Sequence, residues 1–257
     1  MKTEKMFNVD FAKINLKDLT HHLGEVVRDN KKIHLHTANV DHIVIASKDY
    51  KFAEILKSAE IVIADGMPIV WYSKILKKRL PERVTGVDLA YKMCETSREN
   101  NFKMFLLGAA EGIGELATKK MRDLYPNVEI VGSYSPKKEE INDEEKSIQI
   151  IKKINNSGAN VLLVALGAPK QEFWISKYKD VLNTNINIGV GATIDFMAGN
   201  VKRAPMFYQK YGLEWVYRLF QEPKRMFKRY IINDSSFIIL VIKDYIYYQR
   251  KRADKFE

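Results

Sequence analysis

The sequence predicts an α/β fold in which helices flank a mostly parallel sheet, followed by a basic helical appendage. Short apolar stretches typical of buried strands alternate with amphipathic stretches of helical length through most of the chain. Beyond residue 200 the composition changes, because Lys, Arg and aromatic residues crowd together. We therefore expect a body at residues 1–199 and an appendage at residues 200–257.

Six strands are expected in the body, each an apolar run that stops at a turn-forming or polar residue. They lie at residues 33–40, 61–64, 102–107, 128–133, 161–166 and 186–190. Helices are expected at 15–30, 48–59, 87–100 and 143–155, with three more that end at residue 76, end at residue 124 and begin near residue 173. Ser47 is expected to cap the second helix, and the polar start of the chain has no predicted element. The connections fit βαβ units and a Rossmann-like sheet.

Asp65 is the leading candidate for a catalytic base. It follows the apolar run Ile61–Ala64 directly, and Gly66 and Pro68 then turn the chain into a helix. Ligands of open α/β sheets bind at the carboxyl ends of the strands, where this carboxylate is expected. A helix-capping role is the alternative for this aspartate.

Glycine-rich turns follow three strands, around Gly108, Gly167 and Gly191. Such turns let backbone N–H groups and a helix N-terminus face a phosphate, so a nucleotide or nucleotide sugar is the expected ligand. Tight packing alone could also account for each turn. The spacing of Gly108, Gly112 and Gly114 does not match the dinucleotide fingerprint, and no P-loop motif occurs.

Polar residues beside these strand ends are expected to set specificity. They are Thr37, Asn39, Gln171 and Asp195, whose hydroxyl, amide and carboxylate groups suit a base, a ribose or a sugar. Arg83 could hold a diphosphate or orient an acceptor, or it could be a solvated arginine in a charged loop.

No metal site and no cofactor are predicted. His34, His36 and His42 lie close in sequence, but they lack a nearby carboxylate or cysteine cluster and are expected to be packed or solvent-facing. No Asp-x-Asp pattern occurs, and residues 143–145 are expected to start a helix.

The net charge of +10 is concentrated in the appendage, where 13 Lys or Arg face 6 Asp or Glu. This excess predicts an anionic partner, such as a phosphorylated substrate, a lipid surface or nucleic acid. The tyrosine-rich end of the chain could serve lipid or a second subunit, which would make a homo-oligomer. The single cysteine and the absence of a long apolar run predict a cytoplasmic protein.

Seven segments together resemble the TagA/WecG/CpsF glycosyltransferases, and the resemblance covers roughly residues 7 to 232. The segments are Thr-Ala-Asn-Val-Asp-His at 37–42, Ala-Asp-Gly-Met-Pro at 64–68, Glu-Arg-Val-Thr-Gly-Val-Asp at 82–88, Leu-Gly-Ala-Pro-Lys-Gln-Glu at 166–172, Gly-Val-Gly-Ala at 189–192 with Asp195, Lys-Arg-Ala-Pro at 202–205 and Glu-Trp-Val-Tyr-Arg-Leu at 214–219. Their order along the chain makes the match more specific than any one segment.

The resemblance implies an inverting, metal-independent transferase, peripheral on the inner face of the cell membrane. It would move N-acetylmannosamine from UDP to the 4-hydroxyl of lipid-diphosphate-linked N-acetylglucosamine, an early step of wall teichoic acid synthesis. By the same resemblance Asp65 is the catalytic base, Arg83 is the second catalytic residue, and Thr37, Asn39, Arg83 and Gln171 line the pocket. Arg218 and Arg225 of the appendage close over the UDP diphosphate, and the appendage reaches the anionic membrane.

Three alternatives stay open from the residues themselves. The donor could be another UDP-sugar, such as glucose or N-acetylmannosaminuronate. The body could belong to a dinucleotide-dependent oxidoreductase, against which the glycine spacing argues. The basic tail could bind nucleic acid, although we expect no nucleic-acid partner for the transferase.

Overall fold

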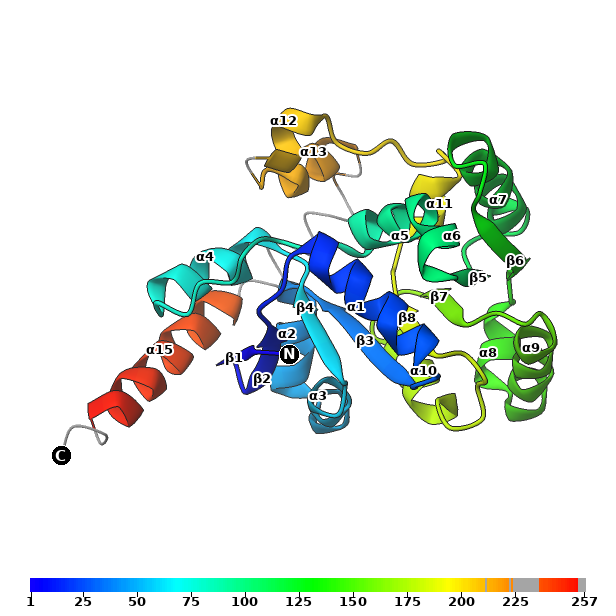
Figure 1. The fold of residues 1–257 in the computed structure, drawn as a ribbon. Coiled ribbons are helices and arrows are strands. Elements are labelled where there is room, and N and C mark those ends of the chain that lie inside the picture. Colours follow the sequence, from blue (N-terminus) through cyan, green and yellow to red (C-terminus); the bar gives the residue numbers. More distant parts are fainter. Residues whose placement is uncertain (211, 222, 224–235, 254–257) are drawn as a thin grey trace.

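The predicted mostly parallel sheet is confirmed in the computed structural model, which describes residues 1–210, 212–221, 223 and 236–253 (Figure 1). Eight strands lie in the order β1-β2-β4-β3-β8-β7-β5-β6. The strands are β1 (Thr3–Met6), β2 (Val9–Ala12), β3 (Ile33–Ala38), β4 (Ile61–Ala64), β5 (Lys103–Gly108), β6 (Glu129–Tyr134), β7 (Val161–Ala165) and β8 (Ile186–Gly189). All pair in parallel except β1 with β2.

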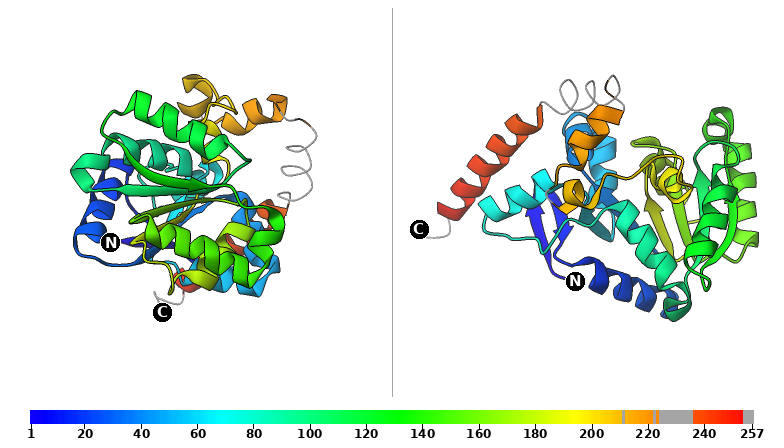
Figure 2. Two further views of the ribbon diagram at one scale, coloured as in Figure 1. Left: turned by 90° about the vertical axis from the view of Figure 1, so that its right-hand side faces the viewer. Right: turned by 90° about the horizontal axis from the view of Figure 1, so that it is seen from above.

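Helices cover both faces of this sheet (Figure 2). Those of the body are α1 (Leu16–Arg28), α2 (Val40–Lys48), α3 (Tyr50–Lys57), α4 (Met67–Ile75), α5 (Gly86–Glu95), α6 (Ser97–Asn100), α7 (Ile113–Leu124), α8 (Lys138–Asn142), α9 (Glu144–Asn156), α10 (Lys170–Tyr178) and α11 (Thr193–Met197). The appendage contains α12 (Met206–Lys210), α13 (Glu214–Gln221) and α15 (Phe237–Ala253). Within the described residues, no helix is both long and apolar enough to cross a membrane.

The core lies on both sides of the sheet because successive strand residues point to opposite faces. In β7, Val161 and Leu163 pack with α1, α5, α7 and α11, whereas Leu162 and Val164 pack with α9 and α10. Helices α2, α3, α4 and α15 cover the remaining part of that second face, around β2 and β4. Strands of such a doubly covered sheet are apolar throughout, which is why their apolar runs were visible in the sequence.

The start of the chain forms a hairpin that was not predicted. Phe7 and Asn8 connect β1 to β2, both with φ above +50°. Two residues with positive φ make the tight turn that suits a two-residue hairpin. The alternation of buried Val9 and Phe11 with exposed Asp10 is the signal that could have revealed β2. This hairpin places Phe7 beside the appendage, against Phe237.

The region after β3 also differs from the prediction. The strand ends at Ala38 rather than residue 40, and Asn39 caps the additional helix α2. The expected helix at 48–59 is α3, and its cap is Asp49 instead of Ser47. The Asp49 carboxylate accepts N–H bonds from Lys51 and Phe52, which a serine at 47 is too far along the chain to do. The expected helix at 87–100 breaks at Thr96 into α5 and α6.

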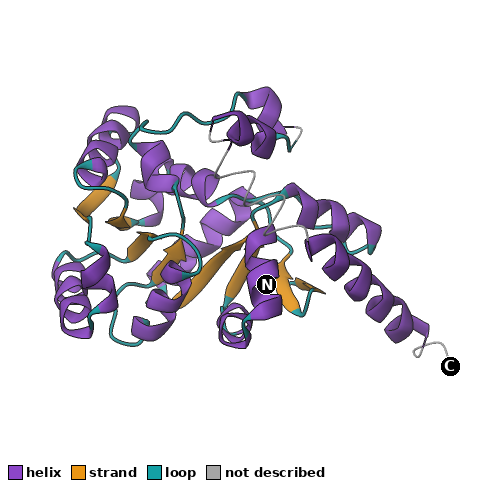
Figure 3. Cartoon of the chain, turned by 180° about the vertical axis from the view of Figure 1, so that it is seen from behind, coloured by secondary structure: helices purple, strands orange, loops and turns teal. Residues whose placement is uncertain are grey.

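The appendage helices occupy two places (Figure 3). Helices α12 and α13 lie above the carboxyl ends of the central strands, and α15 runs alongside α4 (Figures 1 and 3). Helix α15 is joined to the body by Asp244, whose carboxylate accepts hydrogen bonds from the Phe7 N–H and the Tyr72 hydroxyl. A domain boundary at residue 200 stays a prediction.

Candidate functional site

A pocket of about 730 Å³ opens at the carboxyl ends of the neighbouring strands β4, β3, β8 and β7. Strands β3 and β8 are neighbours in the middle of the sheet. The chain continues from β3 to β4 on one side of this pair, and it reaches β8 from β7 on the other. Open α/β sheets bind their ligands at such a point, where the strand order reverses. Eight of the residues singled out in the sequence line it: Thr37, Asn39, Asp65, Arg83, Gly167, Gln171, Gly191 and Asp195.

Asp65 stands at the end of β4, where backbone contacts fix its position. Its N–H donates to the Ala38 carbonyl on β3 at 2.9 Å, which continues the sheet pairing by one residue. Its carboxylate Oδ2 accepts the Gly86 N–H at 3.2 Å, from the first turn of α5. Helix α4 is capped at Gly66 rather than by this side chain. The carboxylate therefore faces the pocket from a rigid strand end.

Thr37 and Asn39 come from the end of β3. The Thr37 hydroxyl donates to the Gly189 carbonyl of β8 at 3.0 Å, tying the two central strands together. Asn39 caps α2, because its Oδ1 accepts the His42 N–H at 3.3 Å. Both residues thus combine a structural contact with a place in the pocket wall.

Gln171 is held at the pocket by a buried polar chain. Its Oε1 accepts the Gly191 N–H at 3.1 Å, and its Nε2 donates to Glu172 Oε1 at 2.6 Å. The same carboxylate oxygen lies 3.1 Å from His42 Nε2, and His42 Nδ1 lies 2.9 Å from Asn39 Oδ1. Asn39, His42, Glu172, Gln171 and Gly191 therefore form one connected network across the ends of three strands.

Glu172 carries the negative charge of this network. Its side chain is 1% exposed, so burial acts to raise its pKa, but the hydrogen bond and charge of His42 and the amide of Gln171 outweigh that effect. The net result is a pKa of Glu172 below its ordinary value. The carboxylate stays ionised and anchors two residues whose other ends reach the pocket.

Arg83 reaches the pocket from the loop before α5 and pairs with the appendage. Its Nη1 lies 3.1 Å from Glu214 Oε2 at the start of α13, and both side chains are mostly buried. Arg203 lies between the acids Asp88 and Glu214, with its guanidinium bonded to Asp88 Oδ1. These pairs hold the start of α13 over the pocket, and Glu214 and Trp215 form part of its wall.

The remaining predicted residues divide into three groups. Gly167 and Gly191 line the pocket with positive φ, and Asp195 lines it from α11 while accepting a hydrogen bond from Asn200. Gly108 is not among the pocket-lining residues; its φ of 111° and its close packing against Ala165 give it a structural reason to be glycine. The Arg218 side chain and all of Arg225 lie outside the described residues, so their roles stay predictions.

Sequence reasoning did not assign roles to Glu172, Glu214 and Arg203. Each lies inside a segment that carried the family resemblance, at 166–172, 214–219 and 202–205. That membership was the available signal. Their partners are far away in the chain: Glu172 and His42 are separated by 130 residues, and Arg83 and Glu214 by 131.

His34 and His36 lie on β3 and are buried beneath the site. Of the two alternatives expected for them, packed or solvent-facing, the structure shows the packed one. Their ring centroids are 4.1 Å apart. Burial lowers the pKa of His34 to about 4, against the opposing charge of Glu172, and it also lowers the pKa of His36 well below its ordinary value. Both rings are neutral at pH 7. In the described part of the chain, no three His, Cys, Asp or Glu side chains converge to hold a metal ion.

We expect the protein to lose stability as the pH falls from 6.5 toward 4. In that window the unfolded chain binds a proton at residue 34 that the folded chain excludes, so the free energy of unfolding falls, by about 3 kcal/mol for His34 at pH 4. Urea unfolding across this range measures the effect. His34→Leu should flatten the slope, whereas His21→Gln, at an exposed position on α1, should leave it unchanged. Equal slopes in all three proteins would contradict the assignment.

Comparison with known proteins shows which family and which relatives the chain is similar to. The family model described as "Glycosyl transferase WecG/TagA/CpsF family" matches residues 4–251. The chain is 30% identical, over 95% of its length and 92% of the relative's, to a Bacillus spizizenii protein named N-acetylglucosaminyldiphosphoundecaprenol N-acetyl-beta-D-mannosaminyltransferase. Proteins of the same name from Bacillus subtilis and Staphylococcus aureus are 29% and 31% identical, over 95% and 74% of this chain and 93% and 72% of their own lengths.

Proposed function

The chain belongs to the WecG/TagA/CpsF glycosyltransferase family, and we propose that it transfers N-acetylmannosamine to N-acetylglucosaminyl-diphosphoundecaprenol. The donor is UDP-N-acetylmannosamine, and the new β-1,4 bond forms with inversion at the 4-hydroxyl of the acceptor sugar. The names of the relatives support the acceptor and the transferred sugar. The observation that carries the proposal is the convergence of Asp65, Arg83, Thr37, Asn39 and Gln171 on one pocket.

Asp65 acts as the general base. Inversion in one step requires the acceptor oxygen to attack the sugar C1 while the bond from C1 to the UDP oxygen breaks. The acceptor hydroxyl proton passes to the Asp65 carboxylate, and the electron pair of the broken bond leaves with UDP. Since a carboxylate is a weak base toward a sugar alcohol, the proton moves as the bond to UDP breaks.

Arg83 stabilises the charge that develops on the departing diphosphate. A guanidinium binds phosphate oxygens through two parallel N–H bonds, and one Arg83 nitrogen already donates to Glu214. The Glu214 contact thereby orients the guanidinium without using all of its five donors. Arg218 and Arg225 supply further positive charge from the appendage when the donor is bound.

Thr37, Asn39 and Gln171 hold the sugars and the nucleotide base of the substrates through hydrogen bonds. Gly167 and Gly191 line the pocket, and a side chain at either position would be strained by the positive φ. The absence of side chains there leaves room for a bulky ligand. The Gly191 N–H is engaged by Gln171, so Gly191 contributes close approach of the backbone rather than a donor to phosphate.

The enzyme works as a peripheral protein on the inner face of the membrane. The acceptor named for the relatives is a membrane lipid, whereas UDP-sugars are cytoplasmic metabolites, so the reaction requires access to both. The positive charge of the appendage supports binding to anionic lipid.

The test is UDP release from UDP-N-acetylmannosamine, measured with and without a short-chain lipid-diphosphate N-acetylglucosamine, in EDTA. We expect release that requires the acceptor and survives the chelator. UDP-glucose and UDP-N-acetylmannosaminuronate, assayed side by side, should give less product. Faster release from either of these donors would replace the proposed sugar, and a requirement for added divalent cation would overturn the metal-free mechanism. No release with any donor would overturn the transferase.

A further inference from the structure

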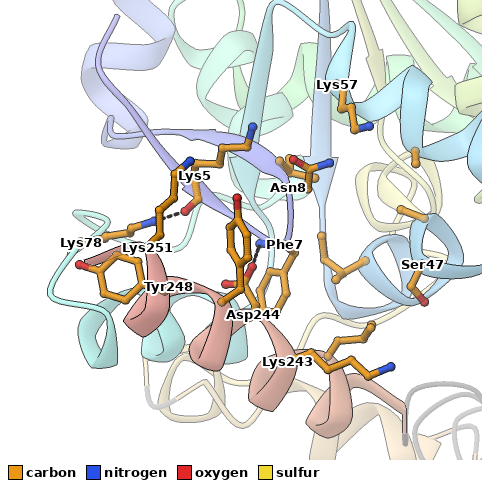
Figure 4. A pocket seen from close by; sticks show the side chains of 16 residues that line it. Lys5, Phe7, Asn8, Ser47, Lys57, Lys78, Lys243, Asp244, Tyr248 and Lys251 are labelled. Atoms are coloured by element: carbon orange, nitrogen blue, oxygen red, sulfur yellow. Dashed lines mark hydrogen bonds between the residues drawn. The ribbon is translucent and has the colours of Figure 1, made fainter. Parts of the chain in front are cut away.

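A second pocket, of about 1130 Å³, lies beside the first and takes no part in the chemistry proposed above (Figure 4). Helix α15 forms one wall, and the turn between β1 and β2, helix α2 and helix α3 form the others. Much of the lining is apolar, including Val9, Ile43 and Leu240. The pocket therefore exists only where the appendage packs against the N-terminal hairpin.

Five lysines lie around this pocket: Lys5, Lys57, Lys78, Lys243 and Lys251. Lys57 is paired with Glu54, but the other four have no carboxylate partner among the described residues. The one acid in the lining, Asp244, has each carboxylate oxygen engaged, by Phe7 N–H and by the Tyr72 hydroxyl. The pocket thus carries a positive charge that the described chain does not neutralise.

Lys5, Lys78 and Lys251 lie at one end of the pocket, where Lys78 contacts Tyr248 (Figure 4). Lys78 Nζ lies 4.9 Å from the centre of the Tyr248 ring and also donates to the Lys5 carbonyl. Lys251 is one helical turn beyond Tyr248 on α15 and lies over the neighbouring Tyr247 ring. Phosphate oxygens are the natural ligand of clustered ammonium groups, so this end fits a phosphate.

The outer side of α15 is apolar and uncovered by any described part of the chain. Leu240, Val241 and Tyr248 face the core, whereas Ile238, Ile239, Ile242 and Ile246 are between 46% and 68% exposed. A helix that is apolar on both sides is ordinarily buried. On α15 the exposed isoleucines instead lie on the helix that walls the lysine pocket, so exposed apolar surface and unpaired lysines adjoin each other.

We propose that this pocket binds the headgroup of an anionic membrane phospholipid, with its phosphate at Lys5, Lys78 and Lys251 and its acyl chains beside the isoleucines of α15. Charge complementarity favours this occupant over a second copy of the chain, whose own surface carries the same excess of positive charge. The adjoining apolar face favours a lipid over nucleic acid, which offers phosphates without hydrocarbon. This lipid site rests on the peripheral membrane location in the proposed function and specifies how the protein would bind there. It does not depend on which sugar is transferred.

The lipid site adjoins the catalytic pocket. Helix α2 contributes Val40 and His42 to the catalytic pocket and Ile43 and Ser47 to the lysine pocket. Phe237, the first residue of α15, lines the catalytic pocket and packs against Phe7 of the lysine pocket at a ring distance of 5.4 Å. A phospholipid bound there places the catalytic pocket beside the surface that presents the lipid-linked acceptor.

The experiment compares two triple variants of the full chain in vesicle sedimentation. One removes the pocket lysines (Lys5→Gln, Lys78→Gln, Lys251→Gln), and the matched control removes equal charge from exposed positions on α7 and α9 (Lys119→Gln, Lys146→Gln, Lys152→Gln). On vesicles of phosphatidylcholine and phosphatidylglycerol, the pocket variant should lose roughly tenfold or more of its binding, and the control should lose little. Both should bind equally weakly to pure phosphatidylcholine.

A second measurement separates a defined site from diffuse attraction. Dihexanoyl phosphatidylglycerol, used as a dispersed monomer, should protect Lys5 and Lys251 from acylation in mass spectrometry, and inorganic phosphate should protect them less. Equal losses in the two triple variants, or equal protection by inorganic phosphate, would overturn the lipid site. Protection by a short-chain polyprenyl diphosphate alone would overturn the phospholipid as occupant.

These outcomes are independent of the transferase assay. UDP release with the short-chain acceptor should proceed in both triple variants, because none of the six lysines lines the catalytic pocket. Vesicle binding could depend on the pocket lysines in a protein that releases no UDP. That result would support the lipid site and overturn only the proposed reaction.

Discussion

Asp65→Asn is expected to lower turnover by about 10² to 10⁴-fold, the usual contribution of a positioned general base, while donor affinity stays close to that of the unsubstituted protein. Asparagine has nearly the same shape, and its side-chain oxygen can still accept the Gly86 N–H. The substitution therefore removes the base and retains the local fold. Single-turnover rates with saturating donor and acceptor, together with calorimetric titration of the donor, measure the two effects separately.

Asp195→Asn is the matched control for this experiment. Asp195 also lines the pocket, but its carboxylate already accepts a hydrogen bond from Asn200 and lies on α11 instead of at the end of β4. Loss of its charge should change turnover much less than loss of the Asp65 charge. Asp65→Asn turning over about as fast as the unsubstituted enzyme would remove Asp65 from the mechanism, and a larger loss in Asp195→Asn would move the base to that position.

Glu172→Ala is expected to lower the free energy of unfolding by about 3 to 5 kcal/mol, because it removes one partner of a buried polar network. His42 and the Gln171 amide would each lose the acceptor that holds them. Donor affinity should fall together with stability, since Asn39 and Gln171 are positioned through the same carboxylate. Urea unfolding at neutral pH and donor titration are the two measurements.

Two variants determine whether this effect belongs to the buried network. Glu172→Gln keeps an oxygen acceptor in place and should cost only about 1 kcal/mol, the net value of an ordinary hydrogen bond. Glu54→Ala breaks a surface pair with Lys57 and should change stability by less than about 1 kcal/mol. A Glu172→Ala protein as stable as Glu54→Ala would show that the network is not needed to hold the site.

The central strands and the site could be predicted for the same physical reason. A strand of a doubly covered parallel sheet must be apolar over its whole length, so the first polar residue marks its end. Asp65 was found in this way, Gln171 was found as an amide just beyond the turn after such a strand, and the parallel sheet then brings those ends together. The position of each residue relative to its own strand is local information, which a single sequence contains.

The parts that were missed depend on capping, on short strands and on distant contacts. Asn39 was expected inside a strand at 33–40, whereas it forms the capping box of α2 together with His42. Strands β1 and β2 lack the continuous apolar run that revealed β4, which is equally short, and the brief alternation within β2 is a weaker signal. The Arg83–Glu214 and His42–Glu172 contacts join residues over 100 positions apart, and nothing near either residue in the sequence identifies its partner.

Helix α2 lines both pockets, one near each of its ends. Its residues from Val40, at the catalytic pocket, to Ser47, at the lysine pocket, span about 10 Å at the rise of an α-helix. A phospholipid headgroup in the lysine pocket and a sugar in the catalytic pocket would therefore lie against opposite ends of the same short helix. The two pockets are thus joined by a single helix and not by a loop.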